Sequence, residues 1–463
     1  MVCGARNGAL RQAVALHRSL CPPRAPNTIE FRPLTSAAGR CATRAREAIA
    51  IMSKALPLDL AALRAAHARI APAVIRTAQW DNDPLSEELG VALQLKLENL
   101  QRTGSFKIRG ATHKIDRLLA SGARPAGVIA ASAGNHAQGV ARAAGLAGLP
   151  ATVVMPLNAP LTKLQACRAL GAQVVLHGDT LEQAADEARR LAADQALVFL
   201  HPYDDWDVIA GQASCGLEML EDAPDMSVAI VPLGGGGLIA GIALALKLQR
   251  PDIRVIGVQT EAVAPYRHYL RDGRLEAVAT GAHTIADGIK VKRPGELTCR
   301  VIAAWVDEIV TVDDNAIAEA IVTLLERTHT IGEGAGVVGL AALMQRKIAL
   351  SPSDRVVCVI SGGNVDMSLV GRSIDYGLAS SGRLMSVSVV VSDAPGHLLR
   401  ILRSVAGLGI NIRHVEHRRG ELHVPVGMTE IILQMETRDS AHQQELLAHF
   451  AAEGLAAKNL VVA

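Results

Sequence analysis

From about residue 55 onward, short aliphatic runs alternate with segments of helical periodicity, and this alternation is the strongest constraint on the fold. Gly127–Ala131, Ala151–Met155 and Val228–Val231 are almost wholly apolar, and polar or glycine-rich loops bound them. Ser105–Leu119 and His136–Ala147 have helical spacing. The pattern predicts an α/β architecture with mostly parallel sheets, in which ligands bind at the carboxyl ends of strands.

Further elements are predicted in the same way. Strands are expected at 91–97, 174–176, 254–258 and 356–360, and helices at 161–170, 181–193, 238–248 and 316–325.

The chain has 463 residues, which is more than one ordinary domain. Residues 1–51 are rich in arginine and contain only two acidic residues, Glu30 and Glu47. We interpret them as a disordered extension or as sequence before a true start at Met52; an organelle transit peptide shares the same bias. The main domain is predicted at 52–370, a linker at 371–384 and a small βαββα module of ferredoxin-like type at 385–463, with a final strand expected at 460–462.

The composition excludes several classes of partner. The net charge of +2 indicates neither a nucleic-acid nor a membrane partner, and no apolar run is long enough to span a bilayer. The seven cysteines lack metal-type spacing, so no metal site is predicted; Cys167, Cys215 and Cys358 lie in apolar segments. A reducing, cytoplasmic location is expected. Aromatic residues make up only 2% of the chain, so its core must be aliphatic.

A lysine stands near the start of a predicted helix, in Ser105-Phe106-Lys107-Ile108-Arg109-Gly110. A surface lysine is the ordinary interpretation of such a residue. Here, however, Glu98-Asn99-Leu100 ends a strand and Thr103-Gly104 forms a tight turn, so Lys107 is held on a strand-to-helix loop. A lysine in such a position can be preorganised and partly desolvated, as a nucleophilic amine must be near neutral pH.

Four consecutive glycines, Gly234, Gly235, Gly236 and Gly237, follow the strand at 228–231 and precede Leu238 and a helix. Main-chain N–H groups of such a loop can converge on an anion, and the helix adds its positive end. Because no lysine follows the glycines as in a nucleotide triphosphate loop, a single phosphate is the better ligand. A purely structural glycine-rich turn is the alternative.

Three further motifs follow predicted strands or begin helices. Ser132-Ala133-Gly134-Asn135-His136 carries hydroxyl, amide and N–H groups that suit a carboxylate and a phenolic oxygen, or that simply cap the next helix. Ser361-Gly362-Gly363-Asn364 places a serine at a strand end, where a turn residue is the ordinary interpretation. Glu333, in Gly332–Gly336, is either an acid near a site or a helix-start charge.

Together these motifs resemble the fold-type II pyridoxal-phosphate enzymes, and within them the threonine/serine dehydratase branch. The likeness runs from about residue 70 to 370, and four spaced motifs occur in the family's order. It implies a two-lobed catalytic domain similar to the tryptophan synthase β-subunit, with a small lobe at about 95–205, pyridoxal 5'-phosphate as cofactor, and a homo-oligomer, dimer or tetramer.

The resemblance also implies roles for individual residues. Lys107 looks like the lysine that forms a Schiff base with the cofactor, and Phe106 flanks it. Asn135 resembles the residue that hydrogen-bonds the cofactor's ring oxygen. The remaining matches are the phosphate loop Gly234, Gly235, Gly236, Gly237 and Leu238, the ring-nitrogen partner Ser361, the acid Glu333, the substrate-carboxylate loop Ser132, Ala133, Gly134 and His136, and the segment Thr284–Gly288.

The C-terminal residues 385–463 resemble an ACT domain, an amino-acid-sensing module. Asp393, Pro395, Gly396 and Leu398 match the turn that opens its first helix. The resemblance implies an amino-acid effector, with isoleucine as the natural candidate if the enzyme begins isoleucine biosynthesis rather than threonine catabolism.

The expected reaction is elimination of water from L-threonine, giving 2-oxobutanoate and ammonia. L-Serine dehydratase, hydroxyaspartate dehydratase and a β-replacement synthase of cysteine-synthase type are the alternatives within enzymes. Serine racemases of this family carry a second serine where Ala133 stands; alanine has no proton to exchange, so elimination is expected over racemisation. The alternative from a different class is a catalytically dead regulator that binds amino acids. The intact lysine, glycine loop and asparagine argue against it.

Overall fold

A computed structural model describes residues 57–279 and 281–460, and the chain divides into two compact units between Val365 and Asp366. The predicted N-terminal extension, 1–51, lies outside the described residues. Across those described ranges, no helix is both long and apolar enough to cross a membrane.

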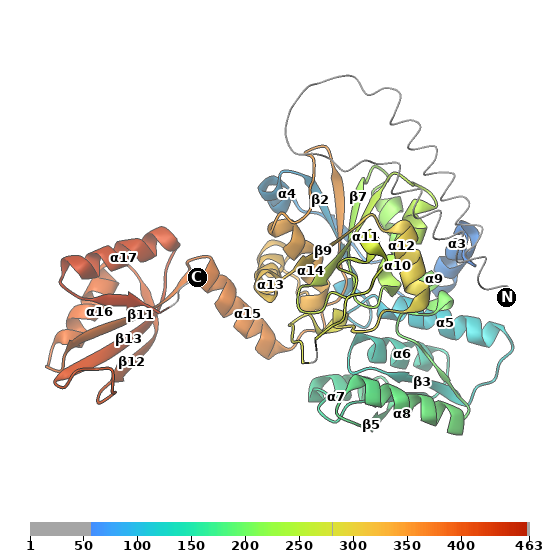
Figure 1. Cartoon of the computed structure of the whole chain (residues 1–463), viewed down its shortest axis with the longest axis horizontal. Coiled ribbons are helices and arrows are strands. Elements are labelled where there is room, and N and C mark those ends of the chain that lie inside the picture. Colours follow the sequence, from blue (N-terminus) through green and yellow to red (C-terminus); the bar gives the residue numbers. More distant parts are fainter. Residues whose placement is uncertain (1–56, 280, 461–463) are drawn as a thin grey trace, which may run out of the picture. The chain divides into compact units, whose positions relative to one another are not determined.

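The first unit is built around a six-stranded sheet with the order β1-β2-β10-β7-β8-β9. Figure 1 labels three of its strands, β2, β7 and β9. All neighbouring strands are parallel except β1, which pairs antiparallel with β2 at one edge. The strands are β1 (Gln79–Asp81), β2 (Ala92–Leu97), β7 (Val228–Pro232), β8 (Arg254–Thr260), β9 (Glu308–Val312) and β10 (Arg355–Ile360).

Helices cover both faces of this sheet because alternate strand residues point to opposite sides. Ala229 and Val231 contribute to one apolar cluster, and Val228 and Ile230 to the other. The first cluster includes α3 (Leu60–Ile70), α9 (Trp206–Asp222), α10 (Gly237–Lys247) and α12 (Glu296–Trp305). The second includes α4 (Asp83–Leu89), α13 (Asp314–Thr328) and α14 (Gly334–Met344).

A smaller, fully parallel sheet with the order β5-β4-β3-β6 forms the second lobe of this unit. Its strands are β3 (Gly127–Ala131), β4 (Ala151–Met155), β5 (Gln173–Leu176) and β6 (Leu197–Phe199). One face packs on α5 (Lys107–Ala120), α6 (Asn135–Leu146) and α7 (Leu161–Ala169), the other on α8 (Leu181–Asp194). The predicted two-lobed α/β fold is confirmed, and β3 and β4 match their predicted ranges residue for residue.

The second unit has the antiparallel strand order β12-β13-β11-β14, which is the ferredoxin-like topology that the pattern predicts. Its strands are β11 (Leu384–Ser392), β12 (Asn411–Arg418), β13 (Met428–Glu436) and β14 (Ala457–Asn459). Helices α16 (His397–Gly407) and α17 (Ser440–Ala452) share one apolar core with the sheet.

Two predictions in this region differ from the structure. Most of the predicted linker, 371–384, is helical, because α15 spans Met367–Ser380 with Asp366 capping its first turn. The final strand was expected at 460–462; β14 pairs with β11 at Ala457–Asn459, and residues 461–463 lie outside the described part of the chain.

Candidate active site

Lys107 is the first residue of α5 and follows a loop that is fastened to the end of β10. Gly104 makes the turn in this loop with a φ of 68°, a left-handed conformation that favours glycine. The backbone N–H of Phe106 donates to the Ser361 carbonyl at 3.2 Å, and that of Gly363 donates to the Gly104 carbonyl at 2.8 Å. Two motifs about 250 residues apart in the sequence are therefore joined at the carboxyl ends of β2 and β10.

The amine of Lys107 is half-buried. Its Nζ donates to the Pro202 carbonyl at 3.0 Å and lies 5.0 Å from the centre of the Phe106 ring. Burial lowers the pKa of Lys107 to about 8, although the charge of Glu333 acts in the opposite direction. Such an amine is a nucleophile near neutral pH, as the position on a strand-to-helix loop predicts.

A cluster of four buried charges fixes α5 two residues beyond the lysine. Arg109 contacts Glu98 at 2.7 Å and Glu218 at 2.7 Å, and Lys96 contacts Glu218 at 2.8 Å. All four side chains are at most 1% exposed. Although burial acts the other way, the charge of Arg109 lowers the pKa of Glu98. The two positive and two negative charges balance, so the cluster anchors the helix that carries Lys107.

The glycine loop joins β7 to α10 and is fully buried. Gly236 has a φ of 92°, and a Cβ there would lie 2.9 Å from the Cβ of Thr298. A Cβ on Gly234 would lie 2.8 Å from the Cα of Ile289. The loop therefore presents backbone N–H groups at the start of α10 without side chains of its own, which is a geometry suited to an anion cradle. Leu238, by contrast, points into the core at 4% exposure.

One segment, 201–205, connects the lysine with the glycine loop. Its Pro202 carbonyl accepts from Lys107, and the next residue, Tyr203, lies against the glycines: a Cβ on Gly235 would be 2.2 Å from its ring. The carboxylate of Asp204 accepts from three N–H groups at the start of α12, the nearest at 2.8 Å. The structure therefore places Lys107 and the glycine loop against neighbouring residues of the same segment.

Sequence reasoning missed segment 201–205, although a signal was present. Asp205 accepts from the N–H groups of Asp207 and Val208 and so caps α9. The adjacent pair Asp204-Asp205 before an apolar stretch is typical of a helix start.

Glu333, which precedes α14, and Asn135, which begins α6 of the smaller lobe, are in contact. The Asn135 Nδ2 donates to Glu333 Oε1 at 2.6 Å, and Asn135 Oδ1 accepts from Asn364 Nδ2 at 2.8 Å. Burial raises the pKa of Glu333 to about 7, against the hydrogen bond from Asn135. A Cβ on Gly362 would lie 2.4 Å from the Glu333 carboxylate, so the Ser361 loop is part of the same cluster.

The predicted carboxylate loop lies at the end of β3 and is half-buried. The Gly134 N–H donates to Ser132 Oγ at 3.1 Å, so this hydroxyl stabilises the loop itself. His136 is buried, its Nε2 donates to the Leu200 carbonyl at 3.0 Å, and burial lowers its pKa to about 3. A neutral ring tied to the backbone supports the loop and is not arranged as a base. Ala133 packs against the small-lobe core.

Ser361 and the 284–288 segment complete the surroundings. Ser361 follows β10 and is 3% exposed. Asp314 accepts from the Thr284 hydroxyl at 2.6 Å and from the Ile285 N–H at 3.0 Å. A Cβ on Gly334 would be 2.5 Å from the Ile285 carbonyl, so this segment packs against the start of α14, next to Glu333.

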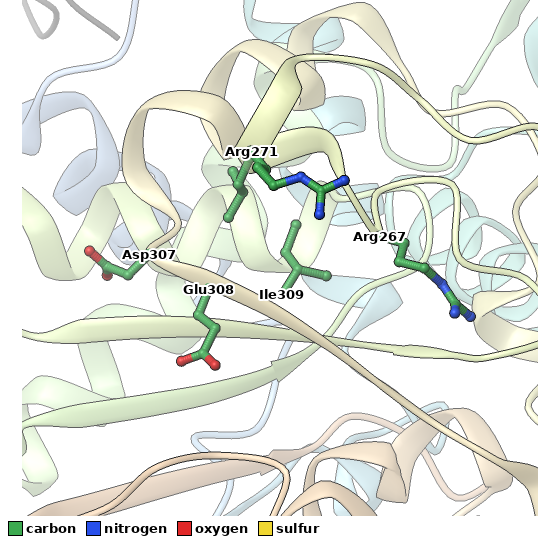
Figure 2. Close-up of a pocket in the computed structure, with 6 residues that line it drawn as sticks. Arg267, Arg271, Asp307, Glu308 and Ile309 are labelled. Carbon is green, nitrogen blue, oxygen red and sulfur yellow. The ribbon is translucent and has the colours of Figure 1, made fainter. Parts of the chain in front are cut away.

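A separate shallow pocket of about 400 Å³ lies at the amino end of β9, away from these residues (Figure 2). Its acidic side chains are already paired: Asp307 with Lys247 at 2.7 Å, and Glu308 with Arg254 at 3.1 Å. The pocket carries no chemistry of the kind found beside Lys107.

Comparison with known proteins agrees with this geometry. Residues 70–362 match the family model described as pyridoxal-phosphate dependent enzyme. An L-threonine ammonia-lyase of Thermotoga maritima is 48% identical over 381 residues, which cover 82% of this chain and 94% of that protein. The structure of maize serine racemase matches with a TM-score of 0.65 and 34% identity, covering 69% of this chain and 97% of that one.

The processed form of threonine deaminase isoform 2 from Solanum lycopersicum matches with a TM-score of 0.64 and 31% identity, over 77% of this chain and 94% of that one. The family model covers more than half of the chain, and the described structure has the lysine, glycine loop and two-lobed sheet arrangement together. The chain belongs to the family of pyridoxal-phosphate-dependent enzymes.

Proposed function

We propose that this protein is an L-threonine ammonia-lyase, which removes water and then ammonia from L-threonine to give 2-oxobutanoate. The observation that carries the proposal is the arrangement around segment 201–205: a half-buried amine of lowered pKa bonds to Pro202, and the next residue, Tyr203, lies against the glycine loop. The Thermotoga maritima relative, which bears the name of this activity, is 48% identical over nearly its whole length.

The residues fit pyridoxal phosphate. Lys107 would hold its aldehyde carbon, and the Gly234–Gly237 loop, where any Cβ would meet Ile289, Tyr203 or Thr298, would take its phosphate. Asn135 and Ser361 come to the same edge from the small lobe and from β10. When bound, the cofactor supplies an electron sink for the bonds at the substrate's Cα.

The chain's own groups would then move protons and orient the substrate. The Lys107 amine, with its lowered pKa, is suited to take the Cα proton. Ser361 offers a neutral hydroxyl rather than a carboxylate, so it cannot hold a ring nitrogen in its protonated form as an acid would. The N–H groups and hydroxyl at 132–135 suit the substrate carboxylate.

Elimination rather than racemisation is supported by Ala133. A racemase needs a second proton donor on the opposite face of the substrate, and the methyl group at this position packs into the small-lobe core. L-Serine dehydratase or hydroxyaspartate dehydratase is the alternative substrate choice, and some activity on L-serine is expected.

The test is steady-state ketoacid formation by the purified protein from L-threonine, L-serine and 3-hydroxyaspartate, with D-serine measured in the L-serine reaction. We expect the highest kcat/KM with L-threonine and no D-serine. No ketoacid from any of the three, together with no cofactor band lost on borohydride treatment, would identify a catalytically dead binder instead.

The lowered pKa of Lys107 predicts how the protein takes up its cofactor. Only the unprotonated amine reacts with an aldehyde, and its fraction rises as pH rises through the pKa of about 8. Reconstitution of the cofactor-free protein, followed by absorbance, should therefore accelerate about ten-fold from pH 7 to pH 9.

Glu333→Gln provides the matched variant for this pH profile. The Glu333 charge raises the Lys107 pKa against burial, so its removal should move the midpoint below pH 8. A midpoint near the ordinary lysine value in the wild type, or one that rises in Glu333→Gln, would contradict this account.

For the C-terminal unit we propose binding of an amino-acid effector. The match to the Thermotoga maritima protein spans 381 residues, more than the 365 of the first unit, so it extends into the second. The turn before α16 is closed by an ion pair of Asp393 with Arg419 at 3.0 Å, and Gly396 has a φ of 98°. Repeating the L-threonine assay with isoleucine and with valine tests this. A cytoplasmic homo-oligomer, dimer or tetramer, is the proposed state of the enzyme.

A further inference from the structure

Asn364 is the last residue of the Ser361-Gly362-Gly363-Asn364 motif and is not among the predicted site residues. Its side chain is half-buried and bridges the two lobes. Its Nδ2 donates to the Thr103 carbonyl at 2.7 Å, in the turn before Lys107, and to Asn135 Oδ1 at 2.8 Å. Resting on the function proposed above, we propose that Asn364 is a positioning residue that fixes the amide of Asn135 toward the cofactor.

The orientation of both amides follows from the contact with the backbone. A carbonyl oxygen can only accept, so the atom of Asn364 that faces Thr103 must be its nitrogen. Both hydrogens of that nitrogen are used, one on Thr103 and one on Asn135. The atom of Asn135 that faces Asn364 must then be its oxygen, which turns the Asn135 nitrogen toward Glu333.

This arrangement leaves one hydrogen of Asn135 for the ring oxygen of the cofactor. The amide nitrogen has two hydrogens, and Glu333 Oε1 takes one of them at 2.6 Å. If the amide turned over, its oxygen would face an anionic ring oxygen and repel it. Asn135 can therefore donate to the cofactor's ring oxygen in only one of the two orientations of its side-chain amide.

Glu333 alone does not hold that orientation. Its pKa lies at about 7, so near neutral pH it is partly protonated and can donate to the Asn135 oxygen as well as accept from its nitrogen. Other charges around this carboxyl are Lys163 and Lys107, which favour its ionised form, and Asp287, which opposes it. Asn364 does not titrate, so it donates to Asn135 at every pH and holds the Asn135 amide in one orientation.

The test compares Asn364→Ala and Asn364→Leu, which has a similar shape and does not titrate, with wild type as holoenzymes between pH 6 and pH 8.5. The wild-type cofactor absorbance spectrum should be nearly constant over this range. In both variants, we expect a spectrum that changes with a midpoint near pH 7, because the Asn135 amide now follows the protonation of Glu333. We also expect about a ten-fold lower kcat for L-threonine with KM changed less than about two-fold, as loss of one orienting hydrogen bond predicts.

Asn99→Ala is the matched control. Asn99 is also a poorly exposed asparagine beside this loop, and its Nδ2 donates to the Ile331 carbonyl at 2.9 Å rather than to Asn135. Asn99→Ala should lose about as much thermal stability as the Asn364 variants but keep the wild-type cofactor spectrum. Adding Glu333→Gln to Asn364→Ala should abolish the pH dependence of the spectrum, since glutamine does not titrate.

The outcomes separate this inference from the proposed function. A wild type that neither binds pyridoxal phosphate nor forms 2-oxobutanoate overturns both. An active wild type with Asn364 variants that match Asn99→Ala in spectrum, pH profile and kcat overturns the positioning role alone.

Discussion

Replacing Lys107 with alanine is expected to abolish 2-oxobutanoate formation while leaving the fold intact. The variant loses both the covalent hold on the cofactor and the base for the Cα proton, and general acid–base assistance alone contributes about 10²- to 10⁴-fold. The effect on stability should be small, about 1 kcal/mol, because the Lys107 Nζ makes one hydrogen bond, to Pro202. Turnover of L-threonine and the urea unfolding midpoint measure the two effects separately.

Two further proteins sharpen this experiment. Lys107→Arg keeps the positive charge but cannot bond an aldehyde, so it should be as inactive as Lys107→Ala. Lys347→Ala, which removes an exposed lysine 3.9 Å from Glu261, should behave as wild type. After borohydride reduction, intact-mass measurement should show one cofactor equivalent on wild type and Lys347→Ala only. Normal turnover in Lys107→Ala would remove the chemical basis of the proposed function.

Much of the fold could be predicted because most strands are short apolar runs. Residues 127–131 and 151–155 are almost wholly apolar, as expected where helices cover both faces, and polar loops mark their ends. The helix α9, at Trp206–Asp222, was not predicted. It is buried along twelve consecutive residues, 208–219, and so lacks the polar face on which the periodicity test depends.

The individual motifs of the site could also be found from the sequence, but their contacts could not. Glycines 234–237 and Lys107 are visible as patterns, whereas the contact of Lys107 with Pro202 joins residues 95 positions apart that share no motif. The bond between Asn135 and Glu333 spans 198 positions. The raised pKa of Glu333 depends on burial by both lobes, and burial of that kind exists only in the folded chain.

Arg109 illustrates the same limit. In the sequence it is one more charged residue two positions after the lysine, and charged residues are mostly exposed. In the structure its side chain is fully buried between Glu98 and Glu218, which come from β2's end and from α9. No single segment of sequence contains the compensating charges, so its burial could not have been inferred.

Arg109→Met is expected to destabilise the protein by about 3–5 kcal/mol, the usual effect of removing one partner from a buried ion pair. Methionine fills similar space, but Glu98 and Glu218 then share only Lys96, and the cluster keeps an uncompensated negative charge. Arg76→Met is the matched control, because Arg76 also pairs with two carboxylates, Glu221 and Asp222, yet is 47% exposed; it should cost less than about 1 kcal/mol. Urea unfolding of the three proteins at pH 7 measures both changes.

Because α5 begins with Lys107, Arg109→Met should also weaken cofactor retention. Adding Glu98→Gln to Arg109→Met should restore part of the stability. Equal, small losses in the two methionine variants would show that the cluster does not anchor the lysine helix.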